Sequence, residues 1–155
     1  MIYWLTGQPG HGKTVQAKLL LEYLRDSSPA GVQTFHIDGD DLRTLVQNQD
    51  YSRAGRENNI RLAQSIAKYL HAKNANVVVS LVAPYRELRE EFKTIMATDL
   101  VEIYVHTSEI RGREHFHTDY EKPETNFIEL CTDAEEPDQT FERLIDLIDS
   151  WEGAS

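Results

Sequence analysis

The chain has 155 residues, of which 40% are hydrophobic and 27% are charged, and this composition is typical of one folded globular domain rather than a disordered or collagen-like chain. Its formal charge is −10, but residues 129–155 hold nine acidic side chains and one basic one, so the other 128 residues carry only −2. A nearly neutral body argues against nucleic acid as a partner and still permits a small anionic substrate.

Apolar runs typical of buried strands alternate along the chain with amphipathic segments typical of helices. The expected strands cover residues 2–6, 32–37, 76–82, 100–105 and 127–130, and the expected helices cover residues 13–24, 57–73, 85–96 and 141–151. A further helix is expected from Leu42. This alternation predicts right-handed βαβ units and a parallel sheet covered on both faces, in a single α/β domain over residues 1–155.

A glycine-rich segment lies between the first predicted strand and the first predicted helix and fits the pattern G-x-x-x-x-G-K-[ST]. It consists of Gly7, Gln8, Pro9, Gly10, His11, Gly12, Lys13 and Thr14. Backbone N–H groups of such a loop surround phosphate oxygens, the lysine adds a charge and the hydroxyl coordinates Mg²⁺. We expect ATP to bind here. An ordinary βα turn is the alternative, and His11 is expected to be a spacer that faces solvent.

Carboxylates follow the second predicted strand, at the edge of the sheet where open α/β folds bind ligands. Asp38 and Asp40, with a glycine between them, can point into one cleft, where phosphoryl transfer needs groups for the acceptor hydroxyl and for Mg²⁺. For Asp41 we expect a structural role as the N-cap of the helix from Leu42. Arg43 is expected to clamp an anionic acceptor.

Together with Tyr51-Ser52, Arg56 with Asn59, and the run Val-Ser-Leu-Val-Ala-Pro-Tyr-Arg at residues 79–86, these motifs resemble the adenylylsulfate kinases over residues 1 to about 105. That family transfers the γ-phosphoryl group of ATP to the ribose 3′-hydroxyl of adenylylsulfate. The resemblance implies a three-layer P-loop kinase fold with a five-stranded parallel sheet flanked by helices, and Mg²⁺ as the cofactor.

The resemblance also implies roles for individual residues. Asp40 is the base or anchor for the acceptor hydroxyl, and Asp38 lies near the metal and the phosphates. Arg43, Arg56 and Asn59 hold the phosphosulfate and sugar of the acceptor. Tyr51 replaces a phenylalanine that stacks on the adenine. Val82, Ala83 and Pro84 line the same pocket. The alternatives are core packing for Tyr51, and ordinary polar positions at a helix start for Arg56 and Asn59.

Two departures from the family pattern affect the expected mechanism. Ala83 stands where the family has a serine, which excludes a phosphorylated serine at this position, although direct in-line transfer needs none. The lid, at about residues 107–126, is shortened and lacks the family's lysines. We expect Arg111 and Arg113 to cover the transferring phosphate and Phe116 to sandwich the acceptor base. His115 and His117 lack a third ligand at suitable spacing for a metal site. Cys131 is expected to be a buried small residue.

The sequence therefore predicts an ATP-dependent small-molecule kinase, with adenylylsulfate as the leading acceptor. The alternatives are a kinase of another nucleotide-linked anion, such as a surface-sugar precursor, or a nucleotide-binding module without turnover. The partners expected are ATP and an anionic nucleotide, with no nucleic acid and no membrane, and assembly into a homodimer is compatible with the sequence. A single cysteine and the absence of a signal-peptide pattern favour the cytoplasm.

Overall fold

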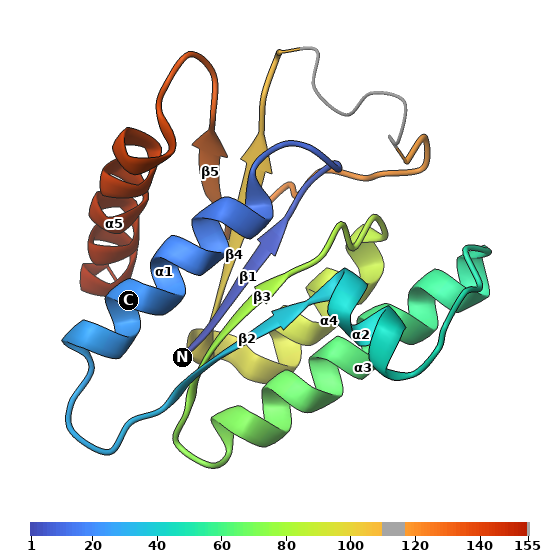
Figure 1. Ribbon diagram of the computed structural model, residues 1–155, viewed down its shortest axis with the longest axis horizontal. Helices are drawn as coiled ribbons and strands as arrows, with labels where there is room; N and C mark the ends of the chain where they lie inside the picture. The colour runs from blue at the N-terminus through green and yellow to red at the C-terminus, as the bar shows by residue number, and fades with distance from the viewer. Residues whose placement is uncertain (110–116, 155) are drawn as a thin grey trace.

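Five parallel strands form one sheet in the order β2-β3-β1-β4-β5 in the computed structural model, which describes residues 1–109 and 117–154 (Figure 1). The strands are β1 (Ile2–Thr6), β2 (Thr34–Asp38), β3 (Asn76–Ser80), β4 (Leu100–His106) and β5 (Ile128–Cys131). Every neighbouring pair is parallel. The predicted five-stranded parallel sheet is confirmed.

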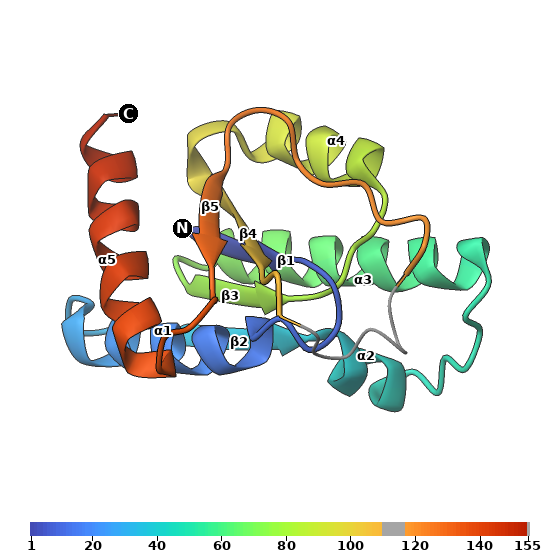
Figure 2. The ribbon, with the colours of Figure 1, turned by 90° about the horizontal axis from the view of Figure 1, so that it is seen from above.

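Helices cover both faces of the sheet, as Figure 2 shows from above. They are α1 (Lys13–Ser27), α2 (Gly39–Leu45), α3 (Arg53–His71), α4 (Arg86–Met96) and α5 (Pro137–Gly153), with a 3₁₀ turn at Ala97–Asp99. One apolar core lies between the sheet and α1 and α5, and a second lies between the sheet and α2, α3 and α4. Within the described residues, no helix combines the length and apolar character that crossing a membrane requires.

The carboxyl ends of the central strands meet at one edge. Asp38 at the end of β2 pairs in register with Ser80 at the end of β3, and Ser80 in turn pairs with Leu5 in β1. The chain visits β1, β2 and β3 on one side of the sheet before it crosses to β4 on the other side. Open α/β sheets bind ligands outside the carboxyl edge near such a change of direction.

Three helices begin earlier than the apolar pattern predicts, namely α2, α3 and α5, and α5 begins at Pro137 rather than at residue 141. Helix α2 begins at Gly39, and Asp38 is its N-cap, because the Asp38 carboxylate accepts a hydrogen bond from the Asp40 backbone N–H at 3.0 Å. The prediction that Asp41 caps a helix from Leu42 is therefore wrong. Helix α3 begins at Arg53, because the Ser52 hydroxyl accepts from the Gly55 backbone N–H at 3.3 Å.

Candidate active site

The glycine-rich segment is a tight loop between β1 and α1. Gly7 has φ +150°, and a Cβ built on it would lie only 2.1 Å from the Val105 carbonyl oxygen, so any side chain here would collide with β4. Gly12 has φ +94° and is the N-cap of α1. L-residues with a Cβ rarely adopt this conformation. Glycine is thus required at both ends of the turn that brings the loop to the α1 N-terminus.

Lys13 is the first residue of α1, and its side chain folds back into the loop. Its ammonium group donates to the Gln8 carbonyl oxygen at 2.8 Å and is almost completely buried. Burial lowers the pKa of Lys13 to about 8, although the nearby Asp38 and Asp40 carboxylates act to raise it. A buried cation that lacks a full counter-charge is well prepared to receive an anionic ligand.

His11 lies inside the protein rather than in solvent. It is buried, and its backbone oxygen accepts a hydrogen bond from the Thr132 hydroxyl at 3.1 Å. The expected solvent-facing spacer is therefore wrong, because β5 and the turn after it cover this side of the loop. His11, which was also expected among the phosphate-binding residues, does not line the pocket beside the loop.

That pocket has a volume of about 580 Å³ and lies at the carboxyl edge of the sheet. Pro9, Gly10, Lys13 and Thr14 of the loop line it together with Asp38 and Asp40. Every described residue that the sequence predicted to contact the acceptor lines it too, namely Arg43, Tyr51, Arg56, Asn59, Val82, Ala83 and Pro84. The fold therefore brings half of the predicted phosphate loop and the described acceptor residues into one cavity with the two carboxylates, whereas Gly7, Gln8, His11 and Gly12 do not line it.

A chain of hydrogen bonds orients Asp38. Its Oδ2 accepts from the Ser80 hydroxyl at 2.9 Å and from the Thr14 hydroxyl at 3.3 Å. His36 Nε2 lies 2.8 Å from the same Ser80 oxygen. Because Ser80 gives its only proton to Asp38, His36 must be the donor in the second bond, so its Nε2 carries a proton. Burial lowers the pKa of His36, against the effect of Asp38.

Ser80 and His36 are site residues that the sequence analysis missed. Ser80 lay within the motif at residues 79–86, and its position at the strand end opposite Asp38 was the available signal.

Arginines line the acceptor end of the pocket. The Arg43 guanidinium lies 4.2 Å from the centre of the Tyr51 ring and donates to the Asp50 carbonyl oxygen at 3.0 Å. Tyr51 is 62% exposed, so the alternative that it packs in the core is wrong, although Arg43 covers one face of its ring. Arg56 Nη1 contacts both carboxylate oxygens of Asp119, at 3.2 and 3.3 Å.

Asn59 adds a polar group to the floor of this pocket. Its side-chain nitrogen donates to the Gly39 carbonyl oxygen at 3.3 Å. Its side-chain oxygen is buried and accepts no hydrogen bond from the part of the chain that the structure describes. Such an oxygen favours a ligand that brings a hydroxyl or amino donor.

The described residues on either side of positions 110–116 bond to other parts of the chain. On one side, the Asp133 carboxylate accepts from the Ser108 backbone N–H at 2.7 Å, and Glu109 accepts from the Ala134 backbone N–H at 2.9 Å. On the other side, the Gln8 amide pairs with the backbone of His117, donating to its oxygen and accepting from its N–H, both at 2.9 Å. The motif allows any residue at position 8, and here Gln8 links the phosphate loop to His117.

The family described as adenylylsulphate kinase matches residues 1–139. The chain belongs to this family. An adenylyl-sulfate kinase of Picosynechococcus is 32% identical over 92% of this chain and 89% of its own length. The Mycobacterium tuberculosis APS kinase CysC, solved as a Cys556Ala mutant, superimposes with a TM-score of 0.75 at 26% identity, covering 96% of each chain. The same kinase in complex with AMPPNP and APS has a TM-score of 0.80 at 23% identity, covers 96% of each chain, and supports the fold.

As an adenylylsulphate kinase, the protein has the predicted P-loop kinase fold. Three predicted site residues, Arg111, Arg113 and Phe116, lie outside the described residues, as does His115. His117 lines the pocket, where burial lowers its pKa. Among the described residues, no three His, Cys, Asp or Glu side chains gather in a way that could hold a metal ion. Cys131 is half-buried rather than buried, because it ends the edge strand β5.

Proposed function

We propose that this adenylylsulphate kinase transfers the γ-phosphoryl group of ATP to the 3′-hydroxyl of adenylylsulfate and releases ADP and 3′-phosphoadenylylsulfate. One observation carries the proposal: a single cavity is lined by Lys13 of the phosphate loop, by Arg43 and Arg56, and by the Asp38 and Asp40 carboxylates. Membership of the family and the APS-bound M. tuberculosis kinase support the choice of substrate.

The phosphate loop holds ATP in this proposal. Backbone N–H groups at the start of α1 and the Lys13 ammonium bind the phosphate oxygens. The approach of the triphosphate raises the lowered pKa of Lys13, so the lysine stays charged when charge spreads over the transferred group. Stabilisation of this charge, together with positioning, provides most of the rate in phosphoryl transfer.

Thr14 and Asp38 fit a magnesium ion. Their side-chain oxygens lie 3.3 Å apart at the edge of the pocket, and Mg²⁺ in kinases is held by a few hard oxygen ligands, phosphates and water. When bound with ATP, Mg²⁺ neutralises part of the phosphate charge. Ser80, held by His36, fixes the Asp38 oxygen that faces Thr14.

Asp40 is the residue that acts on the acceptor. It accepts a hydrogen bond from the 3′-hydroxyl and orients its oxygen for in-line attack. The new bond forms between the 3′ oxygen and the γ-phosphorus as the bond to the β,γ-bridging oxygen breaks, and the hydroxyl proton passes to Asp40. Ala83 provides no phosphorylatable group in the pocket wall, in agreement with direct transfer.

The acceptor residues hold the other end of the substrate. Arg43 and Arg56 neutralise the phosphosulfate, Asn59 accepts a hydrogen bond from the ligand through its buried oxygen, and the exposed Tyr51 ring stacks on the base. With a single cysteine and an anionic metabolite as substrate, we place the enzyme in the cytoplasm.

The test is ADP release from MgATP in the presence of adenylylsulfate, compared with no acceptor and with cytidine and uridine analogues. Turnover that depends on adenylylsulfate is the expected result. Turnover with another nucleotide alone would retain the kinase and replace the acceptor. No turnover with any acceptor, in a protein that still binds ATP, would overturn the proposal in favour of a nucleotide-binding module.

A further inference from the structure

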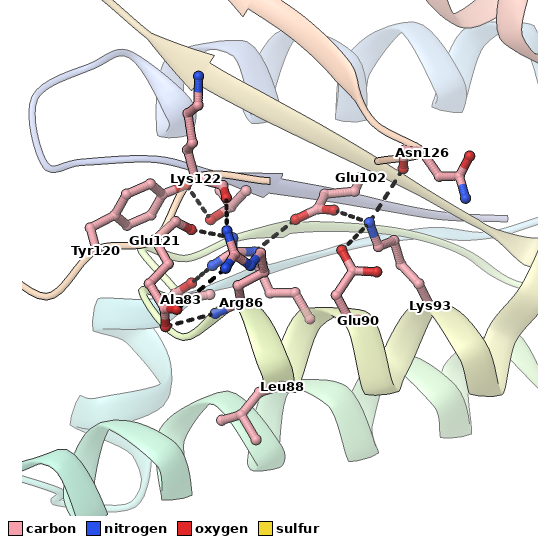
Figure 3. Close-up of polar contacts among 12 residues, drawn as sticks. Ala83, Arg86, Leu88, Glu90, Lys93, Glu102, Tyr120, Glu121, Lys122 and Asn126 are labelled. Atoms are coloured by element: carbon pink, nitrogen blue, oxygen red, sulfur yellow. Dashed lines mark hydrogen bonds and ion pairs between the residues drawn. The ribbon is translucent and has the colours of Figure 1, made fainter. Parts of the chain in front are cut away.

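The most deeply buried charges of the described chain lie behind the pocket wall, outside the groups that the proposed reaction uses. Arg89 of α4 and Glu102 of β4 form an ion pair at 2.7 Å, and each side chain is only 1% exposed. Lys93, one turn along α4, contacts the other Glu102 oxygen at 2.6 Å. Figure 3 shows Glu102 and Lys93 on one side of this cluster and Ala83 and Glu121 on the other.

Arg89 does more than neutralise Glu102. One guanidinium nitrogen, Nη1, donates to the Ala83 carbonyl oxygen, and Nη2 donates to the Glu121 carbonyl oxygen. Lys93 instead donates to the Thr125 carbonyl oxygen at 2.8 Å, away from the pocket. Arg89 therefore joins three parts of the chain: the sheet, the pocket wall and the segment that returns after residue 117.

The pocket wall consists of Val82, Ala83 and Pro84, and the carbonyl oxygen of each residue accepts a hydrogen bond. The Val82 oxygen accepts from the Thr6 hydroxyl at 2.7 Å, the Ala83 oxygen accepts from Arg89, and the Pro84 oxygen accepts from the Glu121 backbone N–H at 2.9 Å. The Thr6 hydroxyl also lies 3.1 Å from the Tyr120 hydroxyl. Glu121 itself is the donor to Pro84. The donors to the other two wall residues, Thr6 and Arg89, each also contact Tyr120 or Glu121.

The middle residue of the wall has an unfavourable backbone conformation. Ala83 has φ +44°, in the left-handed region that residues with a Cβ rarely adopt. Such a conformation persists only where surrounding contacts over-determine it. The Ala83 carbonyl oxygen accepts a hydrogen bond from the buried, charged Arg89 guanidinium, and hydrogen bonds from charged donors are stronger than neutral ones.

We propose that Arg89 is a positioning residue for acceptor binding: its guanidinium holds the wall at Val82–Pro84 and the returning segment at Tyr120–Glu121 in the arrangement that accepts the substrate. The inference rests on the proposed function, which places the acceptor against this wall. Loss of the guanidinium would leave the wall with alternative conformations, and only the fraction in the competent arrangement would bind the acceptor.

The test compares Arg89→Lys with Lys93→Met. Lysine at 89 keeps a cation beside Glu102, but one ammonium group cannot reach Glu102, Ala83 and Glu121 together as the planar fork does. Lys93→Met removes the other cation next to Glu102 and no bond to the wall, so it controls for weakening of the buried ion cluster. Steady-state kinetics give KM for adenylylsulfate and for ATP, and thermal unfolding gives Tm.

We expect Arg89→Lys to raise the KM for adenylylsulfate at least about tenfold and to change the KM for ATP less than about twofold. Lys93→Met should lower Tm and leave both KM values within about twofold of wild type. Equal effects of the two variants on acceptor KM, or no effect of Arg89→Lys, would overturn the inference. If Arg89→Lys does not fold, Arg89→Gln, whose amide can donate to one carbonyl, replaces it with the same expectation.

The wild-type activity distinguishes failure of the inference about Arg89 from failure of the proposed function. If wild type lacks turnover with adenylylsulfate, the proposed function fails first. If wild type turns over and Arg89→Lys matches it, only the role of Arg89 fails.

Discussion

Replacing Lys13 by methionine should stabilise the protein without nucleotide while it removes activity. A pKa lowered from 10.5 to about 8 makes the charged lysine about 3 kcal/mol less favourable in the folded than in the unfolded chain near neutral pH. Methionine removes this cost but also removes the bond to the Gln8 oxygen, a loss of about 1 kcal/mol. We therefore expect Lys13→Met to be more stable by about 2 kcal/mol, which raises Tm by roughly 4–8 °C for a domain of this size.

The assay is denaturant and thermal unfolding of wild type and variant without nucleotide, at pH 7 and at several values up to pH 10.5. Because the folded pKa lies below the unfolded one, the unfolded wild type binds more protons between about pH 8 and 10.5, and its stability rises there relative to the variant. The advantage of Lys13→Met should therefore disappear across this window. MgATP should raise the Tm of wild type and not that of the variant.

A variant that is less stable than wild type at pH 7, or a stability difference that does not change with pH, would refute the reasoning. Either result would mean that the Lys13 ammonium is already well compensated in the free protein.

Three more substitutions test the site. Asp40→Ala should reduce kcat at least about a hundredfold and leave the Kd for MgATP, measured by calorimetry, within about threefold; loss of ATP binding as well would place Asp40 at the phosphates instead. Ser80→Ala should remove the hydrogen bonds to the Asp38 oxygen and the His36 nitrogen and destabilise the protein by about 1–3 kcal/mol. It should also raise the Mg²⁺ concentration that turnover requires. An unchanged Mg²⁺ requirement would make Ser80 purely structural. Gly7→Ala should prevent folding or lower stability by more than about 3 kcal/mol, because its Cβ would collide with the Val105 oxygen, and a folded variant with normal ATP affinity would contradict the loop geometry.

The sheet and the phosphate loop could be predicted from local patterns. Short apolar runs such as residues 76–80 have few alternatives to a buried strand, and the loop glycines are required by backbone geometry that a motif records directly. Tyr51, Arg56 and Asn59 were placed by resemblance, and their common pocket agrees with it. Their roles remain predictions.

The features that were missed depend on contacts between distant parts of the chain. Asp38, Asp40 and Asp41 are all good capping residues, and only the end of β2 decides that Asp38 caps α2. His11 is buried because Thr132, 121 positions away, covers it. The bonds from Arg89 to Glu102 and Glu121 likewise need the assembled fold. Hydrophobic periodicity contains no information on such pairings.

The attachments of Glu109 and His117 have a practical consequence for engineering this kinase. Both residues bond to partners elsewhere in the chain, Ala134 and Gln8, and neither partner belongs to the segment between the two positions. A segment of different length from a relative can therefore be spliced between them with the same end points, and each doubling of a flexible insert adds only about 0.6 kcal/mol of closure entropy. Glu109 and His117 are natural junctions for chimeric kinases in which this segment is exchanged and acceptor preference is measured.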